Sequence, residues 1–127
     1  MNEPANPVAK KIVNALISTA EPNFPVGKHA GFVFQRFKAK YQGLWVGGTL
    51  YLLPDCLDFQ PNAMNRFVHK ADVSRRVALA DIASIKDHFG VVTRIVVVKL
   101  RDATEFKFRC FGAPELVQKI RAQVQMM

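Results

Sequence analysis

The fold of this chain is decided by residues 94–125, which read RIVVVKLRDATEFKFRCFGAPELVQKIRAQVQ. From residue 105 to residue 110 apolar and charged side chains alternate, which is the period of a strand with one buried face. The preceding residues 94–101 hold the run IVVV, typical of a central strand that is partly apolar on both faces. RDAT, at residues 101–104, separates the two. This stretch therefore predicts two strands, 94–101 and 105–111, joined by a tight connection.

The end of the same stretch predicts a helix. Gly112-Ala113-Pro114 is a favourable start, because proline is well tolerated in the first helical turn. The apolar residues that follow recur at helical spacing and form one stripe: Leu116, Val117, Ile120 and Val124. An amphipathic helix after two strands provides apolar cover for a sheet.

Working back toward the N-terminus, five more short runs have extended character. Pro54-Asp55 is a turn signal between two of them, and Gly47-Gly48 is a weak point that predicts a bulge. The five runs are residues 32–40, 44–53, 56–60, 77–79 and 82–88.

The N-terminal residues have a different pattern. Val8, Ile12 and Leu16 recur at intervals of four after Pro7, which predicts an amphipathic helix over residues 5–20. The breakers between residues 21 and 25 end it. We therefore expect an N-terminal helix and connector (1–30) that packs on a main domain (31–127).

Together these elements predict a mainly β protein with flanking helices, of the α+β class. Seven short antiparallel strands followed by one amphipathic helix describe a partly open barrel or sandwich, capped by the C-terminal helix.

Three segments resemble the GRAM domain, a member of the pleckstrin-homology-like (PH-like) superfold. GTLYLLPDCLDF at residues 48–59 is similar to the opening motif of that family, and VALADIASI at 77–85 to its middle segment. EFKF at 105–108, followed by Phe111 and the helix, is similar to the closing strand. The resemblance covers residues 44–125 in the family's order and implies a seven-stranded barrel with a capping helix. The N-terminal helix and the long segment 61–76 depart from the family pattern.

Composition limits the classes of function. The chain has 127 residues, half of them hydrophobic, and a formal net charge of +8. This is one globular domain with a preference for anionic partners, namely lipid, nucleic acid or an acidic protein. The two cysteines, Cys56 and Cys110, are too few for a disulfide scaffold and fall in apolar segments, so buried thiols are expected. No export signal or membrane-spanning run is evident, which favours a cytoplasmic protein.

No residue pattern in the sequence indicates catalysis. The three histidines, His29, His69 and His88, lie in separate segments without metal-ligand spacing. The glycines do not form a phosphate-binding motif. We therefore expect no enzyme activity, no metal and no cofactor.

The first candidate binding region is the irregular segment after residue 61. Its cations surround apolar side chains, so that an apolar tip could enter a membrane interface while the cations meet anionic headgroups. A solvated connector is the competing interpretation. The residues assigned to this site are Arg66, Phe67, Lys70, Arg75 and Arg76.

Two other basic groups are weaker candidates. Arg36, Lys38 and Lys40 share one face of the expected first strand, where PH domains place phosphoinositide-binding cations, but the next strand (44–53) contains no cation. The second group places like charges on one outer face of the last two strands. Their repulsion must be offset by the nearby acids Asp102 and Glu105, by solvation or by an anionic partner. It consists of Lys99, Arg101, Lys107 and Arg109.

The sequence thus predicts a non-catalytic GRAM- or PH-like binding module that associates with anionic membrane lipid or with a protein partner, peripherally at the membrane in the first case. One alternative is a homo-oligomeric or protein-interaction scaffold, since an open barrel edge is compatible with self-association. A nucleic-acid-binding barrel is the less favoured alternative, because no known nucleic-acid motif is present.

Overall fold

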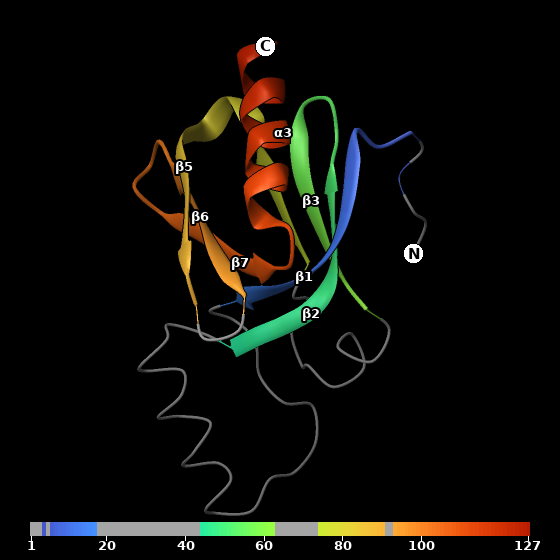
Figure 1. Cartoon of the computed structure of the whole chain (residues 1–127). Helices are drawn as coiled ribbons and strands as arrows, with labels where there is room; N and C mark the ends of the chain where they lie inside the picture. The colour runs from blue at the N-terminus through green and yellow to red at the C-terminus, as the bar shows by residue number, and fades with distance from the viewer. Residues whose placement is uncertain (1–3, 5, 18–43, 63–73, 91–92) are drawn as a thin grey trace, which may run out of the picture.

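A single antiparallel sheet of seven strands forms the body of the molecule (Figure 1). The computed structural model describes residues 4, 6–17, 44–62, 74–90 and 93–127. The strands follow the order β4-β3-β2-β1-β7-β6-β5 across the sheet. Their bounds are β1 Ala9–Ile17, β2 Leu44–Leu52, β3 Cys56–Pro61, β4 Arg75–Ala78, β5 Ile82–Phe89, β6 Arg94–Leu100 and β7 Glu105–Cys110. A short 3₁₀ turn, η1 (Leu79–Asp81), joins β4 to β5, and helix α3 (Ala113–Gln125) ends the chain.

The sheet is open and strongly bent. Its two edge strands, β4 and β5, do not pair with each other. The strands β1 and β2 curve across the lower part of the sheet in Figure 1, so that β3 lies on one side of α3 and β5 and β6 lie on the other. The expected mainly antiparallel sheet with a C-terminal helix is confirmed.

The core lies between the concave face of this sheet and α3. Most strands contribute alternate residues to it, as the period of two requires; Phe59 of β3 and Phe108 of β7 are fully buried. In β5 the buried residues Ile82 and Ile85 are three positions apart, because the register shifts between Ile82 and Ser84. From the helix, the predicted stripe contributes Leu116, Val117 and Ile120 as buried residues, and Val124 packs against them. The helix begins after Gly112, whose φ of 71° is the left-handed conformation that suits glycine.

Two turns fix the strand register. Leu53 N–H donates to the Cys56 carbonyl at 2.8 Å, so the predicted Pro54-Asp55 turn joins β2 to β3. Between β6 and β7, Leu100 N–H donates to the Thr104 carbonyl at 2.8 Å. This second turn places Lys99 opposite Glu105.

The helix predicted over residues 5–20 is wrong, because residues 9–17 form β1, a central strand of the sheet. The interval of four that suggested a helix joins Val8 and Ile12, which are 47% and 80% exposed. The residues that enter the core are Val13, Ala15 and Ile17, which have the period of a strand. Tertiary pairing with β2 and β7 overrides the weak local signal.

The bulge predicted at Gly47-Gly48 is also absent: β2 keeps regular register with β1 and β3 through both glycines. Gly48 instead permits a close approach, since a Cβ there would lie 2.7 Å from Pro61 Cα. The irregularity lies in β5, between Ile82 and Ser84.

Two expectations lie outside the described residues. They are the strand at 32–40 and the domain boundary between residues 30 and 31.

Candidate functional site

The sequence-predicted lipid site is described only at its margin. Arg75 and Arg76 lie on β4 and are exposed. The other predicted residues fall outside the described part of the chain: Arg36, Lys38, Lys40, Arg66, Phe67 and Lys70.

The described strand ends that flank those segments lie on neighbouring strands of the sheet. Ile17, the last residue of β1, pairs with Leu44, the first of β2. Asn62 N–H, just after β3, donates to the Gly47 carbonyl at 3.1 Å. β4 then starts at Arg75, opposite Phe59. The chain thus leaves β1 and enters β2 at paired residues, and it leaves β3 beside Gly47 of β2.

The last residue of β5, Phe89, has an exposed aromatic side chain. Phe89 is 83% exposed, although it is large and apolar. The Arg94 guanidinium lies over its ring at 4.5 Å from the centroid and also forms an ion pair with Asp87. A phenylalanine beside an arginine presents an apolar body and a cation together.

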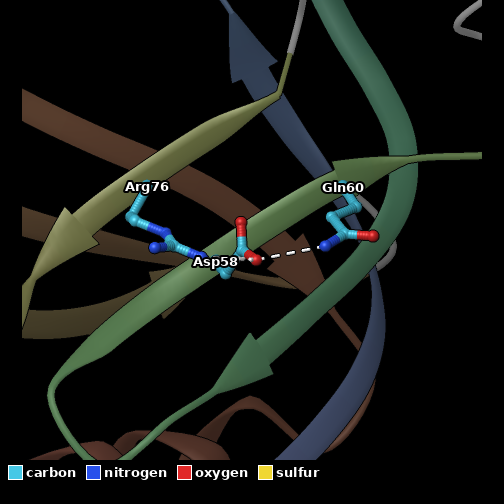
Figure 2. A network of polar contacts seen from close by, with 3 residues as sticks. All are labelled: Asp58, Gln60 and Arg76. Carbon is cyan, nitrogen blue, oxygen red and sulfur yellow. Dashed lines mark hydrogen bonds and ion pairs between the residues drawn. The ribbon is translucent and has the colours of Figure 1, made fainter. Parts of the chain in front are cut away.

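Arg76 is held by a buried carboxylate (Figure 2). Asp58 is only 7% exposed and lies opposite Arg76 in the register of β3 and β4. Its Oδ2 accepts a hydrogen bond from Gln60 Nε2 at 3.1 Å and one from Arg76 Nη2 at 3.4 Å. The Arg76 side chain is nevertheless 67% exposed. Arg76 thus has a structural role at β4. Arg75 acts on a different carboxylate: side-chain and backbone hydrogen bonds lower the pKa of Asp102 in the turn between β6 and β7, and the Arg75 charge is among the further influences that lower it.

We expect Asp58→Ala to lower the free energy of unfolding by about 1–3 kcal/mol, because it leaves the polar groups around a buried site without their acceptor. Arg76→Ala should cost less than about 1 kcal/mol, since that end of the pair is solvated. Urea denaturation of both variants measures the difference. If both variants lose the same free energy of unfolding, the ion pair between Arg76 and Asp58 accounts for the loss. The hydrogen bonds that the buried carboxylate accepts from its other neighbours would then contribute little.

The like charges predicted to face each other on β6 and β7 do not do so. Lys99 lies opposite Glu105, and Lys107 Nζ approaches Glu105 Oε1 at 3.8 Å. The Arg109 guanidinium lies over the ring of Trp45 at 4.4 Å from its centroid. Arg101 is in the turn after β6, where its Nε donates to the Ala80 carbonyl at 2.9 Å. Local partners therefore offset this cluster without any ligand.

Both cysteines are free and buried, as predicted. Cys56 is 6% and Cys110 is 5% exposed. Burial raises the pKa of each thiol above its ordinary value. A raised pKa leaves little reactive thiolate at neutral pH, so neither thiol is activated as a nucleophile.

Among the described residues, no three His, Cys, Asp or Glu side chains gather closely enough to hold a metal ion. His88 is exposed on β5. Within the same described ranges, no helix has the length and apolar character needed to cross a bilayer.

Sequence reasoning missed a groove of about 370 Å³ between β5 and the last turns of α3. Lys86 of β5 and Arg121 of α3 line it together with apolar side chains. Arg121 Nη2 donates to the Ile85 carbonyl at 2.5 Å, which ties the helix to the edge strand. The basic residues of the helix were visible in the sequence, but their position beside an open sheet edge depends on tertiary structure.

No protein-family model matches this chain, and no curated protein matches it either.

Proposed function

We propose that this chain is a non-catalytic binding module of the PH-like type, related to GRAM domains, that associates peripherally with anionic membrane surfaces in the cytoplasm. The strand order β4-β3-β2-β1-β7-β6-β5 with a C-terminal helix in the concavity supports the PH-like assignment, because it is the architecture that the resemblance implies.

The observation that carries the lipid proposal is an exposed aromatic side chain beside a cation. Phe89 is 83% exposed, and the Arg94 guanidinium lies over its ring. In the sequence, the stretches 18–43 and 63–73, which lie outside the described residues, contain five of the ten phenylalanines and the predicted cations Arg36, Lys38, Lys40, Arg66 and Lys70. Apolar side chains among cations suit an interface, since the former enter the headgroup region while the latter meet anionic lipid.

The test is charge reversal at residues of the sequence-predicted site: Arg66→Glu, Lys70→Glu and Arg75→Glu in one variant. Arg76 is left unchanged, because a glutamate there would face the buried Asp58. Each cation near an anionic surface contributes about 1 kcal/mol, so the triple variant should lose about a hundredfold in partition to phosphatidylserine vesicles at low salt. Co-sedimentation with neutral, phosphatidylserine and phosphoinositide vesicles measures the loss.

The matched control reverses three exposed lysines elsewhere: Lys10→Glu, Lys86→Glu and Lys119→Glu. This variant has the same net charge as the first. If both variants lose binding equally, only net charge matters and no membrane-facing site exists. If the parent chain binds no vesicle at either low or physiological salt, the lipid proposal is wrong and a protein-interaction scaffold takes its place.

A further inference from the structure

The edge strand β5 exposes backbone groups that no described strand pairs. One side of β5 is bound to β6, and the sheet order ends there. Gly90 N–H donates to the Thr93 carbonyl at 2.9 Å, so Gly90 and the residues at even positions before it face β6. Ile85 faces the other way, since its carbonyl accepts from Arg121 of α3. The backbone N–H and C=O groups of Ile85 and Asp87 are therefore directed away from β6, and the Ile85 carbonyl is held there by Arg121.

The groove beside this edge has an apolar floor and a basic rim. Its volume of about 370 Å³ is enough for one or two side chains. Ile82, Ile85 and Val124 supply apolar lining, whereas Lys86 and Arg121 supply the charge. No acidic residue lines it, and Asp87, the acid of β5, is paired with Arg94.

We infer that this groove binds an extended acidic segment of a partner protein, which adds to β5 as a further antiparallel strand. An open sheet edge pairs with peptide backbone, which gives this surface its class of ligand. The two rim cations on a chain of net charge +8 select acidic side chains. A second copy of this chain is disfavoured, because pairing β5 with β5 would bring two Lys86-bearing strands of the same charge together.

The geometry also dictates the pattern of the ligand. In an antiparallel pair, opposite residues place their side chains on the same face of the sheet. A ligand residue opposite Ile85 therefore faces the apolar floor, and its neighbours face the side of Lys86. The preferred segment alternates apolar and acidic residues. On binding, a ligand N–H takes the place of Arg121 on the Ile85 carbonyl, which frees the guanidinium to pair with a carboxylate.

The first test measures binding of a capped, fluorescent peptide of alternating glutamate and valine by fluorescence polarisation. Replacing its glutamates with glutamine should weaken binding to the parent chain at least about tenfold, or 1.4 kcal/mol. The double variant Lys86→Glu/Arg121→Glu should show a similar loss. The matched control Lys10→Glu/Lys119→Glu has the same net charge outside the groove and should stay within about twofold of the parent. Equal loss in the two double variants overturns the proposal.

The second test separates strand addition from simple charge attraction. The N–H groups of valines that face the floor point toward β5, whereas those of the glutamates point away. Replacing the valine amides of the peptide with esters should therefore weaken binding about tenfold, and replacing the glutamate amides should change it little. Equal effects of the two ester series mean that no strand forms. The proposal is also overturned if the chain without peptide sediments as a dimer and this dimer does not bind the peptide. In that case a second copy of the chain occupies the edge of β5.

Discussion

Replacing Phe108 with alanine should lower the free energy of unfolding by about 3–5 kcal/mol. Phe108 is fully buried in β7, between Ala15 of β1 and Val96 of β6, with the Phe106 ring 5.7 Å away. The small Ala15 cannot fill the space left by the ring, so a cavity remains in the middle of the sheet. Domains of this size have about 5–15 kcal/mol of stability in total, which makes the loss severe. Urea denaturation measures it.

Phe111→Ala is the matched control. Phe111 lies three residues further along the chain and belongs to the same family-like motif, but it is 72% exposed. We expect a change within about 0.5 kcal/mol. Similar losses at Phe108 and Phe111 would mean that the concave face of β7 is not the core.

Gly48→Val should be nearly as damaging, for a reason unrelated to cavities. Gly48 is paired with Pro61, and an added Cβ would meet the Gln60 carbonyl oxygen and lie 2.7 Å from Pro61 Cα. Both are backbone atoms of β3 and cannot rotate away, so β3 must separate from β2. Overpacking of a core costs about 1–3 kcal/mol, and we expect the upper end or more. Thermal unfolding followed by circular dichroism would record a large fall in Tm.

Gly47→Ala tests the same substitution chemistry on the opposite face of β2. Gly47 is only partly buried and lies opposite Asn14, which is exposed. The Gly47→Ala variant should therefore retain a Tm close to that of the parent chain. If Gly47→Ala lowers the Tm as much as Gly48→Val does, the loss comes from replacing any glycine of β2. The close contact between β2 and β3 at Gly48 would then not be its cause.

Much of the sheet could be predicted because its signals are local. The alternation at Phe106, Phe108 and Cys110 is a property of one strand, and the Pro54-Asp55 turn is chosen by its own residues. β1 could not be predicted in this way. Its buried residues include Ala15, whose small side chain gives a weak hydrophobic signal, whereas the exposed Ile12 gives a strong and misleading one.

The surfaces were harder to predict than the core because they depend on register. Lys99 faces Glu105 and not another lysine, since the Leu100–Thr104 turn offsets the two strands, with Ala103 at a φ of 72°. The groove needs an irregularity in β5 and a helix that ends beside it. Neither the offset nor the irregularity is encoded by one short stretch of residues.

The central place of β1 has a consequence for how the chain is made. Among the described strands β1 comes first along the chain, and its partner β7 follows about ninety positions later, as the pairing of Leu16 with Lys107 shows. Such a high contact order slows folding, because a long loop must close before the pairing contributes. Until then one side of β1 has no neighbour and is open to other chains. The central strand of the finished sheet is an exposed edge of the nascent chain.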